Sequence, residues 1–140
     1  MARITVAEFE EIVRSSLPFA QQLGAEVVEL DAARTLLRLP YREDFLRPGG
    51  TISGPMLMGL ADLAVYAIVL AAIGRVELAV TTSLTINFLR KPPPADILAQ
   101  ARLLKLGKRL AVGEVELYSA GEPEMVAHVT ATYSIPPRAE

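Results

Sequence analysis

One carboxylate stands inside the most apolar stretch of the chain. Asp62 is the only charged residue between Pro55 and Ile73, so no basic residue in that stretch can neutralise it. Burial disfavours the charged form of a carboxyl group, and an unpartnered Asp here costs free energy that Ala or Leu would not. Such a residue either belongs to a structural hydrogen-bond network or acts as a catalytic acid or base. We favour the catalytic role for Asp62.

The residues before Asp62 predict a second chemical feature, the start of a helix. Pro55 suits the first helical position, and Ser53 or Gly54 suits the cap. Free N–H groups at a helix start can hold a carbonyl oxygen that gains negative charge, and Gly54 has no side chain to keep a ligand away. Gly54 and Asp62 are eight residues apart, about 12 Å along a helix at 1.5 Å per residue. Two antiparallel copies in a twofold dimer, but not one helix, could aim both groups at one carbonyl.

The composition excludes several other kinds of chemistry. The 140 residues include no Cys and a single His, which excludes thiolate nucleophiles, Cys-bound metals and multi-histidine metal sites. We expect neither a metal nor a cofactor. The net charge of −2 is not typical of a nucleic-acid-binding protein. His128 falls among the polar residues of the last predicted strand, so we expect it at the surface or in a subunit contact.

The order of the predicted elements favours an α+β fold in a single domain, residues 1–140. An amphipathic helix over 5–17, which Pro18 ends or bends, precedes strands over 25–30 and 34–40. A loop rich in turn residues leads to an apolar helix that ends near Ile73. Alternating patterns predict four further strands, over 80–88, 97–106, 110–119 and 125–135. The apolar helix has to be covered on most sides, and a curved antiparallel sheet around it does so.

The apolar helix is also long enough to be considered as a membrane span. Asp62 in its middle would cost about 2.5–3.5 kcal/mol on insertion scales, and amphipathic strands flank it. We therefore expect a helix buried inside the protein and no membrane partner. At the amino terminus, Thr5 and Glu8 form a capping-box pattern where a signal peptide would need an apolar run, which favours a cytoplasmic location.

The segments around this helix resemble the PaaI-like (phenylacetate-pathway) group of hot-dog-fold thioesterases. The resemblance spans about 39–135. It rests on Gly-Gly-Thr-Ile-Ser-Gly-Pro at 49–55, Leu-Ala-Asp at 60–62, and segments at 80–81, 84–90, 107–109 and 131–133. It implies a hot-dog fold, a curved antiparallel sheet around a long central helix. It also implies hydrolysis of acyl-CoA thioesters in homodimers that often pair into homotetramers.

The resemblance also assigns roles to three residues. Asp62 is the general base or the nucleophile, and the backbone N–H of Gly54 is the oxyanion donor. The hydroxyl of Thr81 positions the attacking water. The alternation of the strand groups Thr82 instead with the apolar Leu84, but we take Thr81 as the site residue.

The sequence departs from the family pattern at the helix start. Ser53 stands where the family usually has His, and the loss of that donor fits slower turnover or a different substrate. Pro55 replaces a second Gly but leaves Gly54 in place. Arg47, where Asn is common, either binds an acidic acyl group or a CoA phosphate, or is a solvated loop residue.

The remaining candidates are substrate-binding residues. Tyr66 lies one turn after Asp62 and either lines the pocket or packs as an aromatic residue. Basic residues near two strand ends are candidate partners for CoA phosphates, although such residues are usually solvated: Arg90, Lys91, Lys108 and Arg109.

An acyl-CoA thioesterase is therefore the function that the sequence favours. Ser53 and Pro55 leave open a dimer that binds acyl-CoA or another small ligand without catalysis. A hot-dog hydratase or dehydratase ranks last, because related enzymes generally use a His and none lies near Asp62. The acyl group and the choice between dimer and tetramer stay open.

Overall fold

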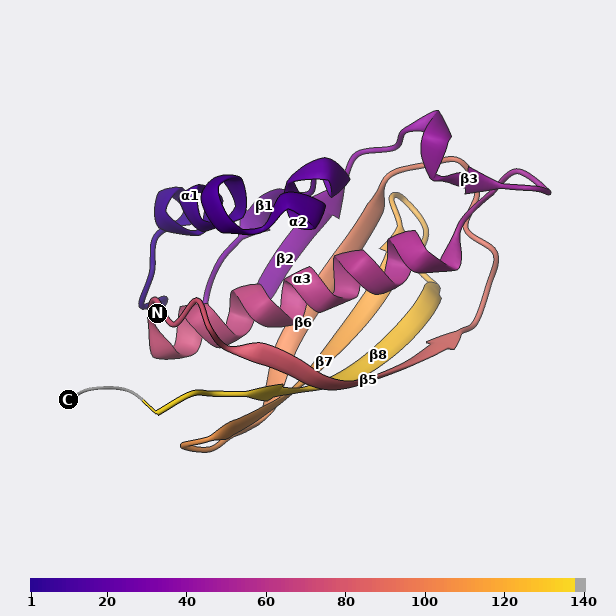
Figure 1. The fold of residues 1–140 in the computed structure, drawn as a ribbon. Helices are drawn as coiled ribbons and strands as arrows, with labels where there is room; N and C mark the ends of the chain where they lie inside the picture. Colours follow the sequence, from indigo (N-terminus) through magenta and orange to yellow (C-terminus); the bar gives the residue numbers. More distant parts are fainter. Residues whose placement is uncertain (138–140) are drawn as a thin grey trace.

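The computed structural model describes residues 1–137 and has the expected α+β, hot-dog architecture. A long helix, α3 (Gly54–Ile73), lies across a six-stranded antiparallel sheet that wraps around it (Figure 1). In spatial order the strands are β1 (Glu26–Glu29), β2 (Thr35–Leu39), β6 (Ile97–Leu106), β7 (Leu110–Ser119), β8 (Met125–Ser134) and β5 (Val80–Phe88). These bounds agree with the predicted strands to within one residue at each end, which confirms the strand predictions.

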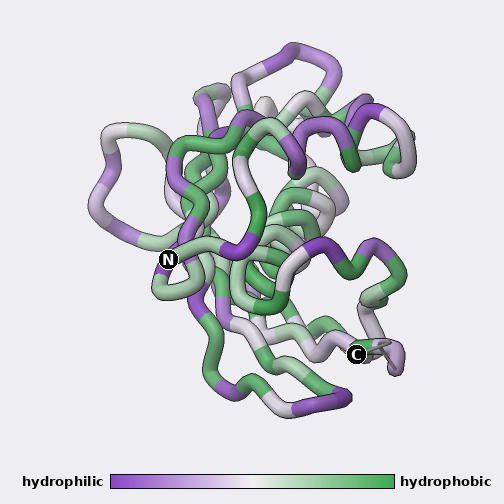
Figure 2. The backbone as a smooth tube through the Cα atoms, turned by 90° about the vertical axis from the view of Figure 1, so that its left-hand side faces the viewer, coloured by the Kyte–Doolittle hydropathy of each residue, from purple (hydrophilic) through white to green (hydrophobic). Residues whose placement is uncertain are grey.

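The ends of α3 follow from its capping residues. Ser53 has an extended backbone at the N-cap, Pro55 lies in the first turn, and Gly74 ends the helix with a φ of +94°. The helix is long and apolar enough to cross a membrane, but 72% of its most apolar window is buried inside the protein. Figure 2 shows this hydrophobic coil near the middle of the molecule. It is the core helix of the fold.

Small residues on the sheet allow α3 to lie close to it. Ala99, Ala101 and Ala131 turn their methyl groups into the core. A Cβ placed on Gly113 of β7 would lie only 3.0 Å from Val65 Cγ1. A larger residue at any of these positions would push the helix away from the sheet, because protein cores are close-packed.

Two N-terminal helices cover one side of α3 (Figure 1). The first, α1 (Val6–Ser16), starts at the predicted capping box of Thr5 and Glu8. Pro18 ends α1, as predicted, but it also begins a second helix, α2 (Pro18–Leu23), which stops at Gly24 with a φ of +78°. The hydrophobic pattern does not predict α2, because six residues contain fewer than two helical turns.

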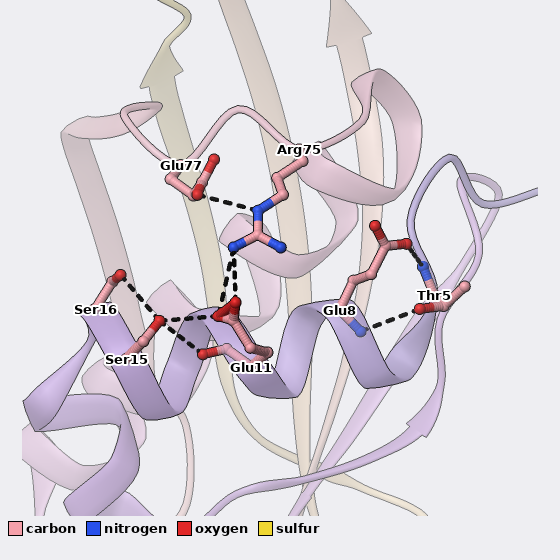
Figure 3. A network of polar contacts seen from close by, with 7 residues as sticks. All are labelled: Thr5, Glu8, Glu11, Ser15, Ser16, Arg75 and Glu77. Atoms are coloured by element: carbon pink, nitrogen blue, oxygen red, sulfur yellow. Dashed lines mark hydrogen bonds and ion pairs between the residues drawn. The ribbon is translucent and has the colours of Figure 1, made fainter.

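Polar contacts tie α1 to the loop after α3 (Figure 3). Arg75 donates from Nε to Glu77 Oε2 at 3.0 Å and from Nη2 to Glu11 Oε1 at 3.1 Å. The hydrogen bond from Arg75 lowers the pKa of the Glu11 carboxyl, with help from the Ser15 hydroxyl. These contacts hold the loop 74–79 against α1.

The loop before α3 also has defined structure. It contains a short 3-10 turn and a two-stranded ladder, and these elements are η1 (Glu43–Phe45), β3 (Leu46–Arg47) and β4 (Thr51–Ile52). Gly49 and Gly50 make the turn between the two strands, with φ of +98° and +74°. The Ser53 N–H donates to the Phe45 carbonyl at 2.9 Å. This contact fixes the start of α3.

Candidate active site

The Asp62 carboxylate accepts hydrogen bonds from two hydroxyl groups. Thr81 Oγ1 donates to Asp62 Oδ1 at 2.6 Å, and the Tyr133 hydroxyl donates to the same oxygen at 2.8 Å and to the Asp62 carbonyl at 3.0 Å. Hydrogen bonds to an ionised acceptor are among the stronger ones in proteins. Within residues 1–137, nothing donates to the second oxygen, Oδ2. Asp62 is therefore held by one oxygen and presents the other.

A β-bulge brings Thr81 to this position. Along β5 and β8, Thr81 pairs with Tyr133, but the next pair is Ser83 with Thr132, so Thr82 has no opposite residue. The extra residue shifts the alternation and turns Thr81 toward α3. Thr82 is exposed, and its hydroxyl donates to the Thr132 carbonyl at 3.2 Å. The simple alternation that grouped Thr82 with the core side is wrong, because it assumes an unbroken ladder.

Tyr133 is the site residue that the sequence argument missed. It is 2% exposed and lies on the face of β8 that turns toward α3. Burial raises the pKa of its hydroxyl, and the Asp62 charge raises it further, so this group stays a hydrogen-bond donor. The alternation along the last strand could have identified it, because it puts Tyr133 on the face opposite His128 and therefore on the side of the sheet that faces the helix.

A cavity of about 370 Å³ lies beside Asp62, and we call it the Asp62 cavity. Its walls come from Leu17 and α2, α3, the loop after α3, the start of β5, and Tyr133 of β8. Tyr66 lines it as predicted and also packs, because its hydroxyl donates to the Glu77 carbonyl at 3.1 Å and its ring contacts Tyr133. Burial, with the nearby Glu77 charge, raises the pKa of Tyr66 to about 12.

The start of α3 has an unused backbone donor. No group within the described residues accepts the N–H of Gly54. The side chain of Ser53 makes no capping hydrogen bond, whereas the Ser53 carbonyl accepts the N–H groups of Met56 and Leu57 at 3.2 and 3.4 Å. A Cβ on Gly54 would lie 3.2 Å from Phe88 Cζ. The N–H is thus available to a ligand, and the position has little room for a side chain.

Basic residues gather at a second cavity of about 370 Å³, the helix-start cavity. Arg47, Arg90 and Lys91 line it together with Gly54. Arg90 pairs with Glu124 at 2.6 Å, while the side chains of Arg47 and Lys91 form no hydrogen bond or ion pair with other residues in 1–137. This arrangement can attract an anionic group to the start of α3.

The structure separates Lys108 and Arg109 from that cavity. Both lie in the β6–β7 turn, at the opposite end of β7 from the turn that contains Glu124. Arg109 Nε donates to the Ile135 carbonyl at 3.1 Å, and Lys108 is exposed. Within one chain they do not join the other three basic residues.

His128 lies on the outer face of the sheet, away from Asp62. Its Nε2 is 2.7 Å from Glu114 Oε1, and the contact lowers the pKa of the Glu114 carboxyl. Among residues 1–137 no cluster of three or more His, Cys, Asp or Glu side chains could hold a metal ion.

Residues 49–126, more than half of the chain, match the family model described as Thioesterase superfamily. The chain belongs to the thioesterase superfamily. The matched segment contains Gly54, Asp62 and Thr81 of this superfamily member, whereas Tyr133 lies outside it.

Solved structures support the same family and fold. A crystal structure from Silicibacter sp. TM1040, for which a thioesterase activity has been proposed, is 45% identical with a TM-score of 0.85, and the match covers 98% of this chain and 95% of that one. A mutant of the phenylacetic acid degradation protein PaaI from Thermus thermophilus is 29% identical with a TM-score of 0.75, over 85% and 99% of the two chains. The predicted PaaI-like resemblance is confirmed.

A curated relative comes from Saccharolobus solfataricus. It is named as a proposed esterase and is 27% identical over 115 residues, which cover 82% of this chain and 81% of the relative.

Proposed function

We propose that this superfamily member hydrolyses acyl-CoA thioesters, with Asp62 of one subunit and the Gly54 N–H of a second subunit acting on the same thioester. The observation that carries the proposal is the Asp62 carboxylate, which lines a cavity, is held through Oδ1 by two hydroxyls, and has no donor to Oδ2 from residues 1–137. The superfamily match, and the esterase and thioesterase names of similar proteins, support hydrolysis.

Asp62 acts as the general base in this mechanism. Its Oδ2 takes a proton from water, and the water oxygen bonds to the thioester carbonyl carbon. The carbonyl oxygen becomes an oxyanion, which accepts the Gly54 N–H at the positive end of α3. The C–S bond then breaks, the carbonyl reforms, and the CoA sulfur leaves with the proton from Asp62. In the nucleophilic variant, Oδ2 attacks the carbonyl carbon, the C–S bond breaks and CoA leaves as the thiolate. Water then hydrolyses the resulting anhydride, which regenerates the Asp62 carboxylate, releases the acid and supplies the proton of the CoA thiol.

Thr81 and Tyr133 orient the carboxylate. Both hydroxyls donate to Oδ1, which fixes the carboxylate and leaves Oδ2 free to be directed at the reacting carbon. The family resemblance implies that Thr81 also positions the attacking water; its hydroxyl would accept a hydrogen bond from that water, because its own proton is donated to Asp62 Oδ1.

The exposed edge of the sheet supports a dimer. β5 is the last strand in the sheet order, and three apolar residues near its ends are about half exposed, namely Val80, Phe88 and Leu89. Antiparallel pairing of two β5 strands about a twofold axis would continue the sheet and cover this edge. It would also place two copies of α3 in opposite directions, so that Gly54 of one faces Asp62 of the other. Two such dimers pairing into a tetramer is compatible with this arrangement.

The helix-start cavity is the proposed site for the phosphates of CoA. The side chains of Arg47 and Lys91 have no polar partner within residues 1–137, and that of Arg90 has only an exposed one, Glu124. An anionic acyl group at Arg47 is the less favoured reading, because Arg47 lines the cavity with the cations rather than the Asp62 cavity.

The test is thiol release from a panel of acyl-CoA substrates by the wild type and by Asp62→Asn. We expect kcat/KM to fall by about 10²–10⁴-fold, the usual contribution of a general base. Equal rates for the two proteins would exclude Asp62 as the catalyst.

A non-catalytic ligand-binding dimer is the second candidate. The Ser53 side chain, in the position where the family usually has His, makes no capping hydrogen bond at the helix start. This function would give tight binding of acyl-CoA with no release of thiol, so calorimetry beside the thiol assay separates the two proposals.

A further inference from the structure

A third cavity lies on the other side of α2 from the Asp62 cavity. We call it the N-terminal cavity; its volume is about 300 Å³, it is partly open to solvent, and residues of α1, α2, β1, β2 and α3 line it. Apolar side chains such as Phe9, Val13 and Leu37 form much of its lining, and polar residues including Glu10 and Arg14 also contribute. The lining is therefore of mixed polarity, and only the part formed by Phe9, Val13 and Leu37 offers an apolar surface to a hydrocarbon chain.

Two residues separate the N-terminal cavity from the Asp62 cavity. Ala20 of α2 and Leu63 of α3 line both cavities. Leu63 follows Asp62 directly in the chain and is 7% exposed. On the α2 side the partition is only a methyl group, so its dimensions depend on these two side chains.

The partition is thin because α2 lies very close to α3. A Cβ on Gly59 of α3 would be 2.9 Å from Phe19 Cε2 and 3.8 Å from Leu23 Cδ2. The Phe19 ring lies against α3 only because position 59 has no side chain, although the ring itself is 58% exposed. Leu23 is buried and anchors the end of α2.

The charges around the Asp62 cavity restrict the acyl group further. The charged residues that line it are Asp62 and Glu77, both acidic, and Glu77 is held by Arg75 from outside the lining. Apolar side chains such as Leu78 and Val80 complete the walls. A second carboxylate on the acyl group would meet two like charges and no cation of the cavity lining.

We propose that Ala20 and Leu63 set the acyl length that this enzyme accepts, and that its acyl groups are uncharged hydrocarbon chains running from the Asp62 cavity toward α2. The inference rests on the proposed function. A chain that fits ends at the partition, and a longer one needs the N-terminal cavity behind it. Up to that limit, kcat/KM increases about fourfold for each CH₂ group buried.

Three variants test this inference in the full-length protein. Ala20→Leu fills the Asp62 cavity at the partition, and Leu63→Ala joins the two cavities. Gln22→Leu is the matched control, because it adds a leucine to α2 at an exposed position. Each protein is assayed with saturated acyl-CoAs from butanoyl to dodecanoyl, and with succinyl-CoA against pentanoyl-CoA.

The expected results differ in direction. Ala20→Leu should lose tenfold or more in kcat/KM on the longest chains the wild type accepts, while its rate with butanoyl-CoA stays within about twofold. Leu63→Ala should move the optimum to longer chains, and Gln22→Leu should match the wild type. Succinyl-CoA should react at least tenfold more slowly than pentanoyl-CoA. Circular dichroism spectra and melting temperatures report correct folding of each variant.

Two other results would count against the proposals separately. Length profiles of Ala20→Leu and Leu63→Ala that run parallel to the wild type would overturn the role of the partition and leave the thioesterase proposal standing. If the wild type releases no thiol from any substrate, the thioesterase proposal fails. Calorimetry with non-hydrolysable S-alkyl-CoA thioethers then tests the role of the partition by itself. Ala20→Leu should weaken the binding of the decyl thioether but not that of the butyl thioether.

Discussion

The Asp62 cavity and the helix-start cavity have about the same volume but opposite chemistry. The Asp62 cavity is mostly apolar, has two acidic residues in its lining, and holds a carboxylate with two hydroxyl donors from the same chain. The helix-start cavity has three basic residues and the Gly54 N–H, which no residue in 1–137 accepts. Within one chain, the proposed base Asp62 thus has its hydrogen-bond donors, whereas the proposed oxyanion donor, the Gly54 N–H, has no acceptor.

If Gly54 and Asp62 act on the same thioester, the site needs two subunits. About 12 Å of helix separates Gly54 from Asp62, so the base of one chain cannot serve its own oxyanion donor. Opposite chemistry at the two cavities suits a thioester whose carbonyl lies between them, with hydrocarbon on one side and CoA phosphates on the other.

Mixing two inactive variants tests the sharing of one site by two chains. Asp62→Asn removes the base. Gly54→Pro removes the N–H at a position that suits proline, but its ring requires the Phe88 ring to shift, so circular dichroism and native mass spectrometry first establish that this variant folds and forms dimers. Each alone should be nearly inactive. After unfolding and refolding together, about a quarter of the wild-type activity should return, because half of random dimers are mixed and each has one intact site of two. Absence of any recovery, with mixed dimers shown by native mass spectrometry, would contradict the shared site.

Removing the hydroxyl donors tests how Asp62 is held. Tyr133→Phe and Thr81→Val each delete a hydrogen bond to Asp62 Oδ1 and should lower kcat by about tenfold, since a hydrogen bond to a charged group contributes about 1.5–3 kcal/mol. Tyr118→Phe and Thr82→Val are matched controls on the outer face of the sheet and on the bulge, and should change kcat by less than about twofold. Steady-state kinetics at saturating acyl-CoA provide the comparison. Equal effects of site and control variants would argue against the orienting role.

The basic cluster is tested by its effect on KM. Lys91→Ala or Arg47→Ala should raise KM for acyl-CoA by about three- to fivefold at low salt and leave kcat unchanged, because exposed charge pairs contribute about 0.5–1 kcal/mol and are screened by salt. An acyl-pantetheine substrate, which lacks the nucleotide, should show no change. Arg34→Ala serves as the control, because Arg34 is an exposed cation next to β2, toward the edge of the sheet opposite β5. A change of the same size with Arg34→Ala would remove the reason for placing CoA at the helix start.

The smallest effect concerns the loop that walls the Asp62 cavity. Glu11→Gln breaks the ion pair with Arg75 shown in Figure 3 and should lower the melting temperature slightly at pH 7. Because Arg75 lowers the pKa of Glu11, this contribution is present above the ordinary pKa of a Glu and is lost as the pH falls through the lowered value. The melting temperatures of wild type and variant should therefore converge in acid. A difference that persists well below the ordinary pKa would mean that the ion pair is not its cause.

Local patterns in the sequence were enough for most of the fold. Alternation and turn residues located the sheet strands to within one residue, and Gly54, Pro55 and Gly74 marked the ends of α3. The apolar surface of α3 required a sheet around it. The short helix α2 was missed, since it is fixed by packing against α3 at Gly59 and not by its own periodicity.

The sequence alone determined that a single carboxylate lies in a buried helix, that an accessible N–H lies about 12 Å before it, and that no thiol or histidine base is close by. Only the tertiary structure decided what holds that carboxylate. The bulge at Thr82 turns Thr81 inward, and Tyr133 reaches Asp62 from β8, 71 residues away in sequence. The physical reason is that alternation describes one strand at a time, whereas a bulge and a hydrogen bond between elements depend on how strands and helix are packed together.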